Sequence, residues 1–196
     1  DGRGDGGTAP AGAKHLAGSK ETRSALSSEL SVLADMERRY EGLGNAVKII
    51  VKSQQDASSR LDYIDGILTE KIGTDVEHAG AVEAALEGLT DVLLIRDTAR
   101  LLCDGETLSQ LEGRVHFLSL DRIEPFADDA DFSRYPFVRG RLVEFVECES
   151  RYAPLAWRLL GKTLVVDSLD AAMELSGYTR AGYSFVTLAG ECLTAN

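Results

Sequence analysis

Apolar residues first recur at helical spacing between Leu26 and Leu43. Leucine, methionine and tyrosine side chains follow one another there at steps of three or four residues, which forms one continuous stripe on a helix. The stripe is narrow and balanced charges lie between its members, as is typical of a coiled-coil seam. We therefore predict the end of a coiled-coil arm over residues 20–40, with an ordinary packed N-terminal helix as the alternative.

Glycines interrupt this helical pattern. Gly42 and Gly44 lie close together and favour a helix stop or bend. A further helix is predicted over Asn45–Ser59, and its apolar side carries Val47, Ile50 and Val51. Residues 1–19 are rich in Gly, Ala and Ser without periodicity, so we predict a flexible N-terminal segment there.

From about residue 63 the pattern changes to short β-rich runs that alternate with helical segments, and the alternation occurs twice. The first copy predicts strands at Gly66–Ile72, Asp91–Ile95 and Arg114–Leu120, with helices at Asp75–Leu86 and from Asp97. The second copy predicts strands at Gly140–Val146, Thr163–Val166 and Tyr183–Leu188, with helices at Glu149–Leu160 and from Ser168.

The two copies align residue by residue. Gly66 maps to Gly140, and Phe117–Leu120 maps to Phe185–Leu188. We therefore predict a mixed α/β fold in which two pseudo-repeated α/β subdomains form one domain. Its first half covers about residues 63–123, its linker about 124–137 and its second half about 138–196.

Helix ends carry local signals. Thr74 or Asp75 is the predicted N-cap of the first helix of the repeat, and Ser168 caps the last helix. Gly161 closes the helix that begins at Glu149. Gly105 falls inside the helical pattern after Asp97 and predicts that this helix is broken or short.

The last β-rich run leads into a hairpin signal. Ala189-Gly190 separates Tyr183–Leu188 from a second short run, Cys192–Thr194. No further segment is evident to cover this strand pair. We therefore predict that it forms an exposed sheet edge, at which pairing with a second copy of the chain adds main-chain hydrogen bonds.

Charge excludes some functions. The chain has a formal net charge of −11, and residues 1–62 contain equal numbers of acids and bases, so the excess lies in residues 63–196. An acidic domain repels phosphate, which disfavours strong non-specific nucleic-acid binding. No apolar run approaches the roughly 20 residues of a membrane span. The chain begins at Asp1, and we expect it to be a fragment of a longer protein.

Few residues suggest chemistry. The three cysteines have no CxxC spacing, which disfavours a disulfide framework or a zinc site and fits a reducing cytosol. The phosphate-loop, GxSxG and HExxH patterns are absent. The acids at Asp128, Asp129 and Asp131 are expected to form a solvated loop, and Trp157 is expected in the core. We expect no catalytic, cofactor or metal site in this chain.

Five segments, in this order, resemble the hinge domain of structural maintenance of chromosomes (SMC) proteins: Tyr40–Val47, Glu77–Leu86, Phe117–Asp121, Gly161–Val166 and Val186–Glu191. The resemblance covers about residues 40–196 and looks bacterial. It implies a module that joins two SMC chains at the tips of their coiled-coil arms, in a cytoplasmic, nucleoid-associated protein whose ATPase head lies elsewhere. It also implies that the hinge continues past Asn196 with a glycine-rich segment, so that residues 41–196 are a C-terminally truncated hinge.

Candidate contacts follow from this interpretation. The predicted dimer interface consists of Phe185, Val186, Thr187, Leu188, Gly190 and Leu193. An alternative function is nucleic-acid binding through bases near the coil junction, namely Arg38, Arg39, Lys48, Lys52 and Arg60. A third possibility is a small-molecule-binding or enzymatic α/β domain that uses the acidic linker, which requires a concave pocket there.

Overall fold

The computed structural model describes residues 26–28, 30–31, 43–53, 61–109 and 113–194. The chain divides into two compact units, residues 1–43 and 44–196. In the first unit residues 26–28 and 30–31 are helical, and Leu26 and Leu30 are exposed. The rest of the predicted coiled-coil stripe and the predicted flexible segment lie outside the described residues.

The second unit begins with helix α2 (Asn45–Ser53). One side of this helix is buried, and it carries the predicted apolar residues together with one alanine: Ala46, Val47, Ile50 and Val51. The predicted helix is therefore confirmed as far as Ser53, and residues 54–59 lie outside the described part of the chain.

A three-stranded sheet forms the first half, in the order β1-β3-β4. The central strand is antiparallel to β1 and parallel to β4. The strands are β1 (Ile64–Ile67), β3 (Leu93–Ile95) and β4 (Phe117–Ser119), and the helices are α3 (Ala79–Ala85), α4 (Thr98–Cys103) and α5 (Gly105–Ser109).

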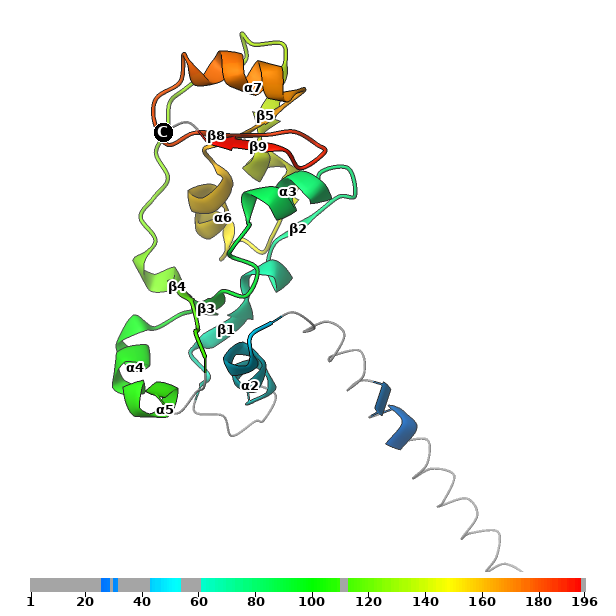
Figure 1. The fold of residues 1–196 in the computed structure, drawn as a ribbon. Helices are drawn as coiled ribbons and strands as arrows, with labels where there is room; N and C mark the ends of the chain where they lie inside the picture. The colour runs from blue at the N-terminus through cyan, green and yellow to red at the C-terminus, as the bar shows by residue number, and fades with distance from the viewer. Residues whose placement is uncertain (1–25, 29, 32–42, 54–60, 110–112, 195–196) are drawn as a thin grey trace, which may run out of the picture. The chain divides into compact units, whose positions relative to one another are not determined.

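A four-stranded sheet forms the second half, in the order β5-β7-β8-β9. The second half contains β5 (Val138–Arg141), β7 (Thr163–Val166), β8 (Ser184–Val186), β9 (Cys192–Thr194), α6 (Ala153–Leu160) and α7 (Leu169–Ser176). Figure 1 shows α7 on one side of this sheet and α6 on the other. Alternate residues of the strands therefore pack against different helices: Val165 and Val186 belong to the core that includes α6, and Leu164 and Phe185 to the cluster beneath α7.

Strand register confirms the internal repeat. Gly66 pairs with Leu94 and Gly140 pairs with Val165, and each glycine lies at a register shift. Their φ angles are 107° and 153°, in the region that favours glycine. The predicted equivalence of Gly66 and Gly140 is therefore confirmed.

Both halves differ from the prediction at the same place. Each long strand predicted after the paired glycines is interrupted by a 3₁₀ turn, at Leu68–Glu70 in the first half and at Leu142–Phe145 in the second. Leu68 and Leu142 are fully buried by these turns. The chain then leaves its sheet, so that β2 (Gly73–Thr74) of one half pairs with β6 (Val146–Glu147) of the other. An alternating pattern cannot distinguish this crossing from a continuous strand.

Two predicted helix starts are wrong. Helix α3 begins at Ala79 instead of Asp75, because Asp75 accepts hydrogen bonds from the backbone N and the Nδ1 of His78, at 2.9 and 2.7 Å, and so stabilises the turn before the helix. Helix α6 begins at Ala153 instead of Glu149. The Ser168 cap of α7 is confirmed, since its Oγ accepts a hydrogen bond from the Ala171 backbone N at 3.2 Å.

The predicted break at Gly105 is also confirmed, because α4 ends at Cys103 and α5 begins at Gly105. The two halves share one hydrophobic core. Leu68 and Val92 of the first half belong to the same buried cluster as Leu142 and Leu155 of the second. The halves are therefore two parts of one folded body, held together mainly by apolar burial.

Candidate interaction edges

Of the strand pair predicted as the open edge, β8 lies in the interior of its sheet and β9 lies at the edge. β8 pairs with β7 on one side and with β9 on the other. Phe185 and Val186 are completely buried, and Thr187 is 4% exposed. These three residues are therefore not free to contact a partner, and that part of the predicted interface is wrong. The edge strands of the four-stranded sheet are β5 and β9, and β9 contains Leu193.

The predicted hairpin itself is confirmed. Gly190 has a φ of 85°, and its backbone N donates to the Thr187 carbonyl at 2.9 Å. The turn lies against α3 of the first half: a Cβ added to Gly80 would be 3.3 Å from the Leu188 carbonyl oxygen. Leu188 and Gly190 therefore contribute to the contact between the two halves, which the sequence prediction missed.

No described strand pairs with the outer edge of β9. The Thr187 N–H donates to the Glu191 carbonyl at 2.9 Å, and hydrogen-bonded and non-hydrogen-bonded pairs alternate along an antiparallel ladder. Phe185 and Leu193 are therefore a hydrogen-bonded pair. The intervening amides of Cys192 and Thr194 then point away from β8, where a further strand could accept them.

A second open edge lies in the first half. β4 pairs with β3, and no other described strand pairs with its outer side. All three of its residues, Phe117, Leu118 and Ser119, are half-buried. From its sequence this segment was predicted to be a repeat of β8 but not to be an edge. The absence of a second β-rich run after Leu120 was the signal that could have shown it.

Hydrogen bonds hold the end of β4 in place. Asp121 accepts from the hydroxyl groups of Thr98 and Ser119, at 2.7 and 2.8 Å, and from the Thr98 backbone N at 3.2 Å. These bonds, the Thr98 hydroxyl first, lower the pKa of Asp121 to about 2. The carboxylate thereby ties the end of β4 to the start of α4, so that the edge is held by the rest of the first half.

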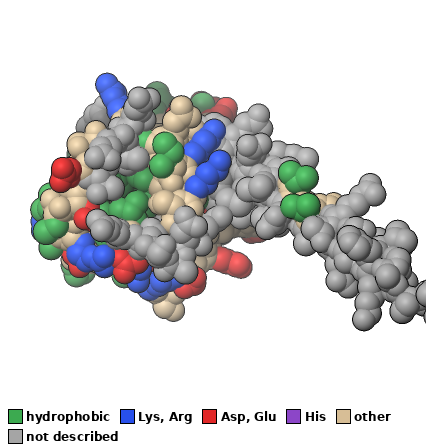
Figure 2. Space-filling view, turned by 90° about the horizontal axis from the view of Figure 1, so that it is seen from below, with side chains coloured by type: hydrophobic (Ala, Val, Ile, Leu, Met, Phe, Trp, Pro, Cys, Tyr) green, Lys and Arg blue, Asp and Glu red, His purple; other side chains and the backbone are tan. Residues whose placement is uncertain are grey.

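The predicted nucleic-acid contacts are only partly placed. Arg38, Arg39 and Arg60 lie outside the described residues, whereas Lys48 and Lys52 lie one turn apart on α2. On the face shown in Figure 2, Lys and Arg side chains form small separate groups, and Asp and Glu side chains lie beside several of them. Among the described residues of that face, this arrangement gives no support to a continuous phosphate-binding surface.

The acidic linker is packed against the second half by one arginine. Arg141 Nη1 forms an ion pair with Asp128 at 2.9 Å and also donates to the Gly161 carbonyl, and its Nη2 donates to the Ala130 carbonyl at 2.9 Å. Arg141 and Asp128 are only 12% and 9% exposed. The Tyr183 hydroxyl donates to the same carboxylate. Asp128 was predicted to belong to a solvated acidic loop. That prediction is wrong, because its side chain is mostly buried and paired.

The structure has a groove beside this linker, as the third interpretation required. One wall is formed by Trp157, which is 37% exposed, so its prediction as a core residue is wrong. The lining side chains of the groove, all from the described residues, include no histidine, cysteine or lysine. Across the described part of the chain no group of His, Cys, Asp and Glu has the arrangement of a metal site. Its helices, searched over the same residues, include none long and apolar enough to cross a membrane.

Several solved structures have a similar fold. The SMC hinge domain of Geobacillus stearothermophilus, crystallised as an asymmetric dimer, matches with a TM-score of 0.72 and 25% identity over 93% of this chain and 73% of that chain. The hinge domain of the Pyrococcus furiosus SMC protein matches with a TM-score of 0.60 and 24% identity over 85% of this chain and 82% of that one.

Curated relatives are chromosome partition proteins named Smc. Those of Myxococcus xanthus and Lactiplantibacillus plantarum are 30% and 29% identical over 176 and 182 residues, which is 88% and 86% of this chain. This chain spans 14% of the length of each. The family described as "SMC proteins Flexible Hinge Domain" matches residues 61–176, more than half of the chain. The chain therefore belongs to the SMC flexible hinge domain family.

Proposed function

We propose that this chain is the dimerisation module of a chromosome-partition Smc protein and joins two Smc chains through its open strand edges. The observation that carries the proposal is the pair of edges, β4 in the first half and β9 in the second. An exposed edge presents unpaired N–H and C=O groups, and strand addition from a second copy would pair them. Each edge belongs to a different half, so two contacts are available to a two-fold dimer.

The solved relative supports this proposal, since the Geobacillus stearothermophilus hinge domain was crystallised as a dimer. The first sheet also has one strand fewer than the second, and a strand from a partner beside β4 would give it a fourth. Pairing of this kind requires no cofactor and no catalytic group, and we include neither in the function of this module.

The function of the whole protein follows from the curated relatives and is part of the same proposal. They are chromosome partition proteins, and this chain spans 14% of their length. We propose that the dimer holds two long arms together so that the complete protein entraps DNA. ATP hydrolysis would then belong to other parts of the protein, which would act in the cytoplasm on the nucleoid.

Solution mass tests the proposed dimer. Light scattering on the chain, from low to high micromolar concentration, should show a shift from monomer towards dimer. Thr194→Pro removes an outward amide of β9 and should leave a monomer with an unchanged circular dichroism spectrum. Thr194→Val, which keeps the amide, is the matched control and should dimerise normally.

Two results would contradict the proposal: a strictly monomeric parent chain over the whole concentration range, or a Thr194→Pro variant of unchanged mass. Val186→Pro is not a test of the interface, because Val186 is paired inside the sheet. We expect that variant to lose folded structure instead, at a cost of about 3 kcal/mol.

A further inference from the structure

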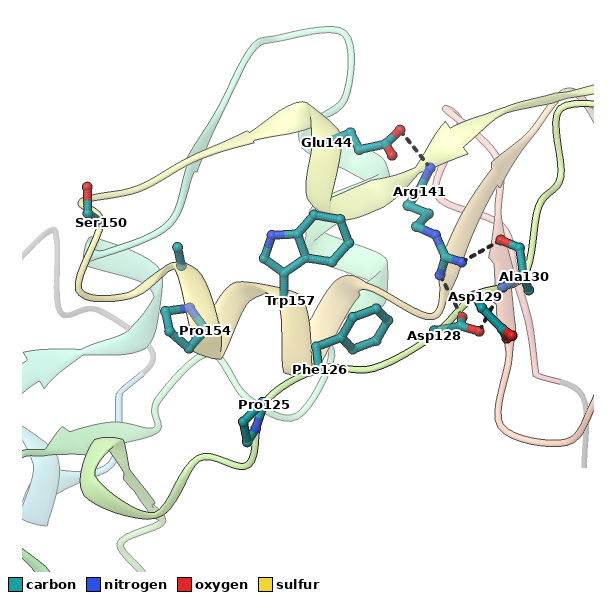
Figure 3. A pocket seen from close by; sticks show the side chains of 11 residues that line it. Pro125, Phe126, Asp128, Asp129, Ala130, Arg141, Glu144, Ser150, Pro154 and Trp157 are labelled. Atoms are coloured by element: carbon teal, nitrogen blue, oxygen red, sulfur yellow. Dashed lines mark hydrogen bonds and ion pairs between the residues drawn. The ribbon is translucent and has the colours of Figure 1, made fainter.

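A groove of about 740 Å³ lies between the linker and α6. Figure 3 shows its two kinds of wall: the linker contributes Pro125, Phe126 and Asp129, and the opposite side contributes Glu144, Pro154 and Trp157. The single tryptophan of the chain is therefore partly exposed in a concave surface instead of being packed in the core. None of the lining residues lies on β4 or β9, so the groove is distinct from the proposed dimer edges.

The aromatic wall is rigidly placed. The rings of Phe126 and Trp157 lie 5.3 Å apart, between centroids, with an angle of 38° between their planes. Phe126 also lies directly on the backbone of Gly161, where an added Cβ would come within 2.8 Å of its ring. Two aromatic rings held in this way can accept a flat or extended group without reorganising first.

The charge of the groove is negative. The guanidinium of Arg141 is engaged by Asp128 and by two backbone carbonyls, so it is not available to a ligand. Asp129 and Glu144 supply the remaining lining charges, and both are exposed. Glu144 is held in place, since its Oε2 accepts from the Arg141 backbone N at 3.2 Å and lies close above Gly140.

The equivalent surface of the first half is covered. Gly80 on α3 occupies the position that Pro154 occupies on α6, and the hairpin turn at Leu188–Gly190 lies against it. In the second half no described hairpin covers α6 at this place, and the linker leaves the groove open beside it (Figure 3). The groove therefore lies where one of two equivalent helix faces has no covering hairpin among the described residues.

We propose that this groove binds an extended, basic and proline-containing peptide segment of a partner protein. An arginine or lysine side chain of the segment lies on Trp157, where the ring face attracts a cation, and its charge is met by Asp129 and Glu144. Prolines of the peptide pack against Phe126 and Pro125, as extended proline-rich segments do in aromatic grooves. The negative lining disfavours nucleic acid and acidic peptides at the same place.

The tryptophan provides a direct test, because Trp157 is the only one in the chain and its emission reports on this groove alone. The probe is an acetylated hexapeptide, Pro-Arg-Pro-Pro-Arg-Pro. The control peptide has citrulline in place of both arginines, which keeps size and shape but removes charge. We expect the arginine peptide to change Trp157 emission saturably, and the citrulline peptide to bind about tenfold more weakly.

Variants of the groove extend the test, with a fluorescein-labelled arginine peptide and anisotropy as the readout. Trp157→Ala should weaken binding about tenfold, and Asp129→Asn and Glu144→Gln about two- to fivefold each. Glu174→Gln on α7, a carboxylate that is also exposed but does not line the groove, is the matched control and should bind normally.

Three outcomes would overturn the proposal: no binding of the arginine peptide, equal binding of the citrulline peptide, or binding that Trp157→Ala leaves unchanged. A loss of dimer mass in Trp157→Ala would also overturn it, because the groove would then be an interface between copies of the chain. A monomeric parent chain that still binds the peptide would instead contradict only the proposed dimer.

Discussion

β4 and β8 are equivalent strands with different surroundings. Both lie parallel to the central strand of their sheet, with Leu93 opposite Phe117 and Leu164 opposite Phe185. Phe185 is completely buried because β9 and α7 cover β8, whereas Phe117 is only half-buried at an open edge. Two similar strand sequences therefore give an edge in one half and an interior strand in the other, and the difference lies in whether a further described strand pairs beside them.

The contact between the halves shows a second difference, in charge. Asp65, which immediately precedes the bulge glycine of β1, pairs with Arg96 at 3.1 Å and with Arg151 of the other half at 3.6 Å. It also accepts a hydrogen bond from the Tyr152 hydroxyl at 2.9 Å. With a side chain 9% exposed, this carboxylate is well covered.

The equivalent position of the second half carries the opposite charge. Arg139 immediately precedes the bulge glycine of β5, and it pairs with Asp167 at 2.8 Å and with Glu77 of the other half at 3.6 Å. Asp167 directly follows the central strand, as Arg96 does in the first half, and Glu77 lies two residues before its helix, as Arg151 does. The repeat has therefore kept two matching sets of ion pairs and reversed every charge.

The largest expected effect comes from making the second half more like the first at Arg141. Its counterpart on β1 is the buried Ile67. Arg141→Ile removes the ion pair of Asp128 and leaves a mostly buried carboxylate with the Tyr183 hydroxyl. We expect a loss of about 3 kcal/mol in the free energy of unfolding, measured by urea denaturation at neutral pH.

The same variant should alter the pH dependence of stability. Burial raises the pKa of Asp128, but hydrogen bonds from Tyr183 and Arg141 outweigh it, so the pKa lies below its usual value. A lowered pKa stabilises the fold above the unfolded-state value of about 3.9, and this stability is lost as the pH falls through the folded-state pKa. Arg141→Ile should reduce the loss of stability at acid pH. If the free energy of unfolding of the variant falls with decreasing pH as steeply as that of the parent chain, the ion pair does not have this role.

A smaller effect is expected at the glycines that end the equivalent helices. A Cβ on Gly161 would come within 2.8 Å of the Phe126 ring, whereas Gly88 has a φ of 78° and open space around it. We expect Gly161→Ala to cost about 2 kcal/mol by overpacking and Gly88→Ala about 1 kcal/mol by backbone strain, measured by thermal unfolding. Combining Phe126→Ala with Gly161→Ala should relieve part of the cost of the glycine substitution, whereas combining it with Gly88→Ala should relieve none. If the costs of Phe126→Ala and Gly161→Ala simply add in the double variant, the contact between the two residues is contradicted.

The smallest effect is expected at Arg139, in a comparison of the two charge-reversed clusters. Asp65 is 9% exposed and hydrogen-bonded, so Asp65→Asn should cost about 2 kcal/mol in chemical denaturation. Arg139 is 46% exposed and its partners are more exposed still, so Arg139→Gln should cost less than about 1 kcal/mol. High salt should weaken only the Arg139 cluster. Equal costs would mean that the difference in burial has no energetic consequence.

Periodicity and turn residues predicted most of the second unit. The strand at Thr163–Val166 was placed at its observed bounds, and the Ser168 cap, the break at Gly105 and the hairpin at Ala189-Gly190 were all found. These features depend on residues close together in the sequence, where local hydrogen bonds and backbone preferences decide the conformation.

The errors have a different physical origin. The strand predicted at Gly66–Ile72 was too long because Leu68 is buried by a turn that carries the chain towards the other half. Trp157 was placed in the core because its helix has other apolar residues, but its own side faces the groove. Gly161 ends α6 as predicted, but only the tertiary structure shows why a glycine is needed there, since its φ is −67° and an added Cβ would come within 2.8 Å of Phe126.

The sequence by itself determined the repeat, the order of strands and helices, and the family. The tertiary structure alone decided which equivalent strand is an edge, since the exposure of β4 and β8 depends on whether a distant segment pairs beside them. It also decided that Arg141 holds Asp128 and that α6 borders an open groove. The spacing of apolar and turn residues along the sequence indicates local conformation. Burial and charge pairing depend instead on contacts between residues far apart in the sequence, and only folding brings those residues together.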